Sequence, residues 1–84
     1  MHELGILRQV VQTVEQSAWR NRIRRIEFIT LEVGEDSGFV PQYLEKLFPV
    51  AIDGIPLFEN AKLKIQTAAG TKMVVKNIGV YKNR

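Results

Sequence analysis

The sequence predicts an α+β protein in which two helices pack on one face of a three-stranded mixed β-sheet. Two segments carry apolar residues at helical spacing, and three others are short and rich in β-branched residues, in the order helix, strand, helix, strand, strand. Each segment has an apolar side, and two layers would bury all of these sides together. The right-handed crossover rule makes the first two strands parallel.

The first helix is expected over about residues 4–20, with a stop at Asn21. Its apolar residues recur every three or four positions and so share one face: Leu7, Val10, Val11, Val14 and Ala18. Gly5 weakens the first turn and leaves the start of the chain freer to adapt around a ligand.

The second helix is expected to begin at Pro41, because proline lacks the N–H that the first helical position does not use. Pro49 is expected to kink this helix or to end it near Phe48, with room for one more turn before Gly54. The predicted buried stripe is Val40, Tyr43, Leu44, Leu47, Phe48 and Ala51. Its aromatic residues, together with Trp19 and Phe39, are interpreted as core or lid packing rather than as a cofactor site.

Three strands are expected, over residues 26–33, 61–65 and 73–81. Ile26 and Phe28 are out of phase with the residues that follow them, and a second slip occurs at Lys76 and Asn77, so a bulge is expected at each place. Ala69-Gly70 predicts a turn, and the short connection there predicts an antiparallel hairpin of the last two strands.

The totals describe one small domain over residues 1–84 with a mild net charge of +3. The sequence has no apolar run long enough to span a membrane and no signal peptide, so a cytoplasmic protein is expected. It contains no cysteine, which excludes disulfides and thiolate metal sites. One histidine and no recognisable pair of carboxylates leave little for a reacting centre, so we do not expect an enzyme.

The first three residues, Met1-His2-Glu3, are the candidate metal site. The α-amino group, the His2 amide and the imidazole Nδ1 can form fused chelate rings around one ion, and nitrogen donors in a plane suit Cu(II) or Ni(II). This requires Met1 to be present and unblocked. The alternative interpretation is an exposed side chain on a frayed end.

Four basic residues gather near the end of the first helix: Arg20, Arg22, Arg24 and Arg25. Cations at that end complement the helix dipole, and no aromatic side chains are interleaved beyond Trp19. A nucleic-acid partner is therefore not expected.

Several motifs together resemble the HypA/HybF family of hydrogenase nickel-incorporation proteins. They are Met1-His2-Glu3-Leu4, Leu31-Glu32-Val33-Gly34-Glu35 with Ser37-Gly38, Val40-Pro41 and Leu44, and Ala61-Lys62-Leu63-Lys64-Ile65. The resemblance covers about residues 1–68. Residues 70–80 are similar to the family's final strand.

Between these parts the sequence departs from the family pattern. Members of the family carry a zinc domain there, built on two CxxC pairs, and this cysteine-free chain has none. The resemblance therefore implies one nickel-binding-type domain, with the zinc domain absent between about residues 68 and 71 and no zinc expected. A zinc module folds around its own metal, so it can be removed where its attachment points lie close together.

The resemblance implies a nickel metallochaperone for hydrogenase maturation. His2 would be the Ni(II) ligand, with the Met1 amine and the backbone nitrogens of His2 and Glu3 as co-donors. The Glu3 carboxylate could bind the metal or accept a hydrogen bond from the imidazole, or it could be only a favourable charge in the first helical turn.

The expected partners are a maturation GTPase, a hydrogenase large-subunit precursor, or both, which would receive nickel by ligand exchange. The alternative is a metal-free protein-interaction module that has lost delivery with the zinc domain. The edge of the predicted hairpin would then serve for docking, for a homodimer or for a strand swap.

Overall fold

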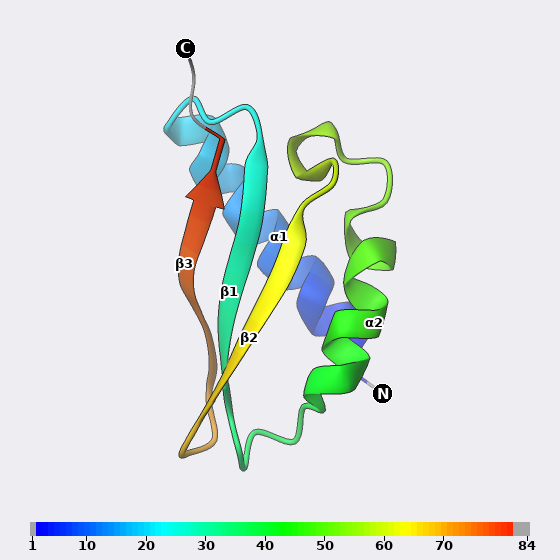
Figure 1. The fold of residues 1–84 in the computed structure, drawn as a ribbon, viewed down its shortest axis with the longest axis vertical. Helices are drawn as coiled ribbons and strands as arrows, with labels where there is room; N and C mark the ends of the chain where they lie inside the picture. The colour runs from blue at the N-terminus through cyan, green and yellow to red at the C-terminus, as the bar shows by residue number, and fades with distance from the viewer. Residues whose placement is uncertain (1, 82–84) are drawn as a thin grey trace.

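The computed structural model describes residues 2–81 and confirms the predicted fold class. The elements are α1 (Glu3–Arg20), β1 (Ile26–Gly34), α2 (Pro41–Ile52), a 3-10 turn η1 (Pro56–Phe58), β2 (Lys62–Ala68) and β3 (Met73–Val80). In Figure 1 α1 runs obliquely behind the sheet, and α2 lies to the right of β2. No helix in this part of the chain is long and apolar enough to cross a membrane.

The α1 helix buries the predicted stripe of Leu7, Val11, Val14 and Ala18, with Val10 half-buried. Its last turn closes through two backbone bonds, from Ile23 N–H to the Ala18 carbonyl at 2.9 Å and from Arg22 N–H to the Trp19 carbonyl at 3.3 Å. This pair of bonds is the Schellman arrangement, which places one residue in the left-handed region. That residue is Arg22, with φ 57°, where glycine is the usual choice.

The α2 helix begins with Pro41 at its first turn, as predicted, and Pro49 lies inside it rather than ending it near Phe48. The helix continues to Ile52, and Pro49 is exposed. Proline removes one N–H, so the carbonyl of Glu45 loses its helical partner. Because Glu45 is also exposed, water can serve that carbonyl instead.

The sheet order is β2-β1-β3, so the predicted hairpin of the last two strands is wrong. β1 pairs parallel with β2, as the crossover rule requires, and antiparallel with β3 on its other side. The free edges of the sheet are therefore β2 and β3, and the edge proposed for docking or swapping is not that of a hairpin.

Both predicted bulges are present in the pairing of β1 with β3. One register shift lies between Ile26 and Phe28. At the other, Val75 and Asn77 pair with successive residues of β1 and leave Lys76 over. The Lys76 ammonium turns across the sheet to Gln66 Oε1 at 2.9 Å and lies 3.9 Å from the Glu32 carboxylate.

Residues 69–72 join β2 to β3 by crossing the end of β1. Three backbone N–H groups at the end of β1 and just after it donate to this turn and to the last residue of β2. Gly34 donates to the Lys72 carbonyl at 2.7 Å, Glu35 to that of Ala68 at 2.7 Å and Asp36 to that of Gly70 at 2.8 Å. A Cβ on Gly34 would stand 2.4 Å from the Gly70 carbonyl oxygen, so only glycine allows this approach. The 69–72 turn thus passes over Gly34, the last residue of the central strand β1.

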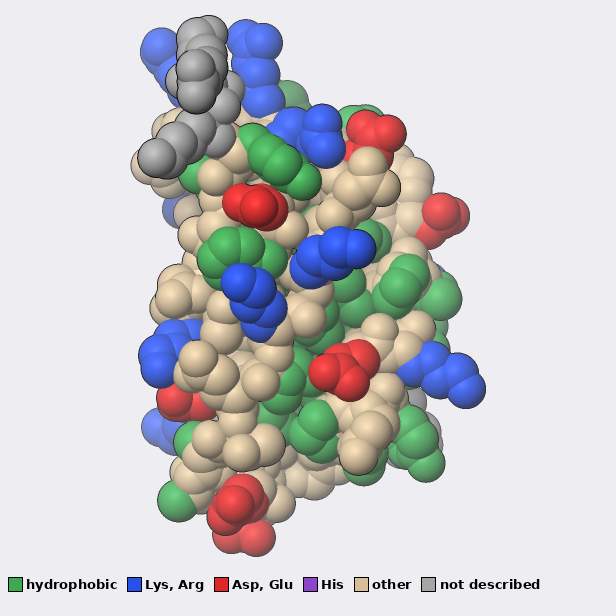
Figure 2. All heavy atoms as spheres, viewed as in Figure 1, with side chains coloured by type: hydrophobic (Ala, Val, Ile, Leu, Met, Phe, Trp, Pro, Cys, Tyr) green, Lys and Arg blue, Asp and Glu red, His purple; other side chains and the backbone are tan. Residues whose placement is uncertain are grey.

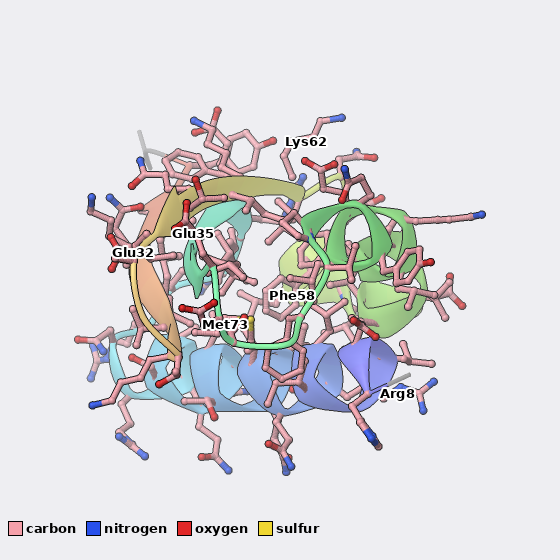
Figure 3. The ribbon with its side chains drawn as sticks, turned by 90° about the horizontal axis from the view of Figure 1, so that it is seen from below. Arg8, Glu32, Glu35, Phe58, Lys62 and Met73 are labelled. Atoms are coloured by element: carbon pink, nitrogen blue, oxygen red, sulfur yellow. The ribbon has the colours of Figure 1, made fainter. Side chains whose placement is uncertain are left out.

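The core lies between the sheet and the helices, and Phe58 and Met73 point into it in Figure 3. Phe58 is fully buried although no predicted stripe contains it, because η1 turns it inward. Three residues assigned to packing are instead exposed: Trp19 by 77%, Tyr43 by 54% and Val40 by 37%. Val40 and Tyr43 belong to the predicted stripe of the second helix, so that stripe is narrower than predicted, and Trp19 lies beside the buried stripe of α1.

The other face of the sheet is uncovered and carries many lysine and arginine side chains (Figure 2). Two of them already lie over aromatic rings: the Lys64 ammonium is 3.8 Å from the Phe28 ring centre and the Arg25 guanidinium is 5.0 Å from that of Tyr81. These cation–π contacts hold the aromatic rings against the sheet rather than offering them to a ligand.

Candidate metal centre

The candidate site is the open N-terminal end of α1. His2 is the N-cap residue, its carbonyl accepts the first helical bond from Ile6 N–H at 2.9 Å, and its side chain is exposed. The His2 side chain makes no capping hydrogen bond. Leu7 and Val11, one turn further on, anchor the helix in the core and so fix where the exposed imidazole begins.

Backbone amides at this end have no acceptor within the helix. The first N–H groups of any α-helix lack an i−4 carbonyl, and here they include those of His2 and Glu3. A metal that displaces protons from these two amides therefore breaks no bond of the helical ladder. The start of a helix is in this respect a better place for backbone nitrogen ligands than a strand would be.

Glu3 differs from His2 in being buried, with 4% of its surface exposed. Its carboxylate Oε2 accepts a hydrogen bond from the backbone N–H of Val40 at 3.2 Å. Val40 is the N-cap of α2, so one carboxylate sits in the first turn of α1 and at the first turn of α2. Negative charge is favourable at both helix N-termini.

The pKa of the Glu3 carboxyl is lowered from its ordinary value of 4.5. The largest cause is a hydrogen bond with the chain's α-amino group; burial acts in the opposite direction, and the backbone N–H groups of Glu3 and Val40 lower the pKa further. The carboxylate is therefore charged at neutral pH and holds positive or donor groups on several sides.

The structure separates the side chains that the sequence groups together. His2 faces solvent and Glu3 faces the interior, while Met1, the third predicted ligand, lies outside the described residues. Among residues 2–81 no three side chains of histidine, cysteine, aspartate or glutamate gather at one point. A metal at this end would thus depend on terminal and backbone nitrogens beside one imidazole.

Glu35 and Asp36 are exposed in the loop after β1, away from the start of α1 in the sequence. Their backbone amides bind the 69–72 turn. The contribution of Val40 was missed, because it is made by a backbone N–H and leaves no trace in side-chain type. The only sequence signal for this contact was an acidic residue in the first turn of one helix together with a proline at the start of the other.

The family model described as hydrogenase/urease nickel incorporation, metallochaperone, hypA matches residues 1–76. Two similar proteins are the hydrogenase maturation factors HypA of Geobacter sulfurreducens, 41% identical over 70 residues, and of Trichodesmium erythraeum, 42% identical over 65 residues. The matches cover 83% and 77% of this chain but 60% and 54% of those proteins. The chain thus spans about three fifths of the length of the first of these curated relatives and less of the second.

The solution structure of the Ni metallochaperone HypA from Helicobacter pylori has the same fold, with a TM-score of 0.85. It is 14% identical in sequence, and the match covers 99% of this chain and 100% of that one.

The fold and the family match define a domain of the nickel metallochaperone class. The chain belongs to the HypA family of hydrogenase and urease nickel-incorporation proteins. The resemblance places a zinc domain after β2, and here only residues 69–72 separate that strand from β3 in a chain without cysteine. The cysteine-based zinc domain is absent from this position.

Proposed function

We propose that this chain binds Ni(II) as cargo at Met1-His2-Glu3 and passes it on by ligand exchange during hydrogenase maturation. One observation carries the proposal: the chain's single histidine is exposed at the open start of α1, in a chain that matches the nickel-incorporation family from its first residue. The role is transfer of an ion, not catalysis of a reaction.

The proposed donors are the His2 imidazole, the Met1 amine and the backbone nitrogens of His2 and Glu3. Nitrogen donors in one plane suit Ni(II), and the two amides are not used by the helix. A site at a chain end suits a carrier, because its ligands can leave one at a time.

Two roles are proposed for Glu3, and its buried position supports the first better than the second. Its carboxylate bond to Val40 N–H favours a role in holding the start of α1 against α2, so that the donors are presented from a fixed base. Direct metal binding or a hydrogen bond to the imidazole would require the carboxylate to turn outward from its buried position.

A nickel titration followed by absorption spectroscopy tests this proposal, on protein that keeps its native Met1. A yellow, diamagnetic species indicates planar nitrogen coordination. His2→Ala is expected to weaken binding and to abolish that spectrum, and one extra residue ahead of Met1 should do the same. If the His2→Ala protein kept the parent's affinity and spectrum, the site would be elsewhere.

The recipients we propose are a maturation GTPase, a hydrogenase large-subunit precursor, or both. The relatives named above are hydrogenase maturation factors, which supports this class of recipient. Loss of nickel transfer to a purified precursor, with unchanged binding of that precursor, would be the signature of a damaged N-terminus.

The second candidate is a metal-free interaction module, and the direct 69–72 connection favours it, because delivery in the family could require the missing domain. Docking, a homodimer or a strand swap would then use the free edges of β2 or β3. Blocking the N-terminus separates the candidates: a metallochaperone loses delivery, whereas an interaction module loses nothing.

A further inference from the structure

The end of α1 opposite the metal site carries an exposed groove. The groove has a volume of about 490 Å³ and is lined by Glu15, Trp19, Arg22, Ile23, Arg24, Ile55, Pro56 and Leu57. We call it the Trp19 groove. It joins the last turn of α1 to the segment around η1, two regions far apart in the sequence.

Trp19 is the chain's only tryptophan and is 77% exposed, although it adjoins the buried stripe at Ala18. Ile23, Ile55 and Leu57 are half-buried around the groove and leave apolar surface open. Large aromatic side chains standing free beside aliphatic walls are typical of protein-binding anchors rather than of bare solvent-facing surface.

The charged residues that line the Trp19 groove are two arginines and one glutamate, Glu15, so the balance is positive. Arg22 and Arg24 line the groove and Arg20 is close in sequence, and among residues 2–81 the side chains of these three make no hydrogen bond or ion pair. Arg25, by contrast, is held by the Glu59 carbonyl at 3.1 Å. The groove thus combines an apolar floor with cations whose hydrogen-bond donors are not engaged by the protein.

Arg22 occupies its place at a conformational cost. It is in the left-handed region, with φ 57°, at the Schellman position where glycine is most favourable. Its neighbour Asn21, a residue that tolerates this conformation, has φ −102° instead. A residue that destabilises its own helix end while presenting a free guanidinium at a groove points to a use for that guanidinium.

We propose that the Trp19 groove docks an acidic segment of a partner protein, which inserts an apolar side chain between Trp19 and Leu57 and pairs its carboxylates with Arg22 and Arg24. A second copy of this chain does not fit, because two arginine rims would repel each other. Single-stranded nucleic acid fits less well, because it needs several stacking rings and this groove has one.

The groove is distant from the metal end. Across the 16 residues from Glu3 to Trp19 the rise of α1 is about 24 Å, so a docked partner leaves the N-terminus free. In Figure 1 the two ends of α1 lie on opposite sides of the molecule. The proposal holds whether or not the N-terminus binds nickel.

Trp19 fluorescence tests the proposal directly. The probes are a short synthetic peptide of glutamates interspersed with leucines, the same peptide with lysines in place of glutamates, and an oligouridylate of the same charge as the first. We expect only the acidic peptide to shift Trp19 emission, with affinity that falls as salt rises.

Arg22→Gly is the decisive variant, with Arg8→Ala as the matched control. Both remove one exposed arginine, and Arg8 lies near the other end of α1, pointing away from the core (Figure 3). Arg22→Gly should raise the Tm and weaken peptide binding about fivefold, as loss of one exposed ion pair does. Arg8→Ala should leave binding unchanged.

Trp19→Ala, followed by anisotropy of a labelled acidic peptide, should weaken binding about thirtyfold, as truncation of a central anchor does. Three results would overturn the proposal: no response of Trp19 emission to the acidic peptide, equal or stronger binding of the oligouridylate, or an Arg22→Gly protein that is more stable and binds as well as the parent.

Discussion

Gly34 is the residue on which the closure of the sheet depends. The 69–72 turn comes so near that a Cβ at this position would meet the carbonyl oxygens of Gly70 and Lys72 at 2.4 and 2.8 Å. Both contacts are with backbone, which cannot move aside as a flexible side chain can. The glycine is therefore required by what lies over it, since its own φ is not in the left-handed region.

We expect Gly34→Ala to destabilise the protein by about 2–3 kcal/mol, because the turn must shift and its short hydrogen bonds lengthen. Chemical denaturation followed by circular dichroism measures this. Gly5→Ala is the control: nothing lies within 4 Å of a Cβ there, and alanine in the exposed face of α1 should stabilise by about 0.5–1 kcal/mol. Equal effects of the two substitutions would show that the turn is not closely packed.

Glu3 should make stability depend on pH in the acid range. Its folded pKa is lowered, so its contribution is present above its unfolded value and is lost as pH falls through the folded pKa. Glu3→Gln keeps an acceptor for Val40 N–H but has no charge to lose. The parent's Tm should exceed that of Glu3→Gln at neutral pH, and the difference should close in acid; a difference that stays constant would contradict this.

The α2 helix shows how an element can tolerate a residue that ordinarily breaks it. Pro49 lies on the exposed side, while Leu44, Phe48 and Ala51 on the other side are buried. The carbonyl that loses its helical partner therefore lies where water can donate to it instead. Apolar packing on the opposite side keeps the segment helical. Sequence pattern located the proline correctly but could not weigh it against this packing.

Pro49→Ala should stabilise the protein by about 1–2 kcal/mol, less than the full helix-interior penalty of proline because alanine also frees the unfolded chain. Thermal unfolding measures the gain. Pro41→Ala is the matched control, and no gain is expected, since Pro41 occupies a position that suits it. A loss of stability in Pro49→Ala would mean that the ring itself packs usefully.

The sheet illustrates where inference from sequence ended. The strand segments and both bulges followed from alternation and its slips, which are local properties of the chain, and the parallel pair followed from the crossover rule. The strand order did not, because a short connection between residues 68 and 73 suits a hairpin equally well. What decides the order is burial: Ile29, Leu31 and Val33 are almost fully enclosed, so β1 takes the centre. Gly34 at the end of β1 was the other sequence signal for this strand order, because the turn that crosses there leaves no room for a Cβ.

The candidate site was predicted as three residues. The hydrogen bond that Val40 N–H donates to the Glu3 carboxylate could not be predicted. His2 and Glu3 are exposed and buried respectively, a difference that depends on how α2 begins beside them. Similarly, Trp19 was interpreted as packing, whereas it is exposed beside the distant segment 55–57. Contacts between remote segments carry no periodic pattern.

At the scale of the whole molecule, the described fold needs no metal to close. Its core is apolar, and the 69–72 turn completes the sheet through three backbone hydrogen bonds. We expect the Tm to be the same with and without a strong chelator, and nickel to raise it only as a ligand that binds the native state. Unfolding by the chelator would show that a metal is part of the fold.

The central position of β1 has a consequence for synthesis. Both of its neighbours come later in the chain, so the most apolar strand emerges from the ribosome with two unsatisfied edges. It must wait for residue 68 on one side and residue 80 on the other, while α1 and α2 can shield only one of its faces. Translation therefore passes through an interval in which the nascent chain is most exposed to aggregation, and that interval ends only when β3 is added at the far edge.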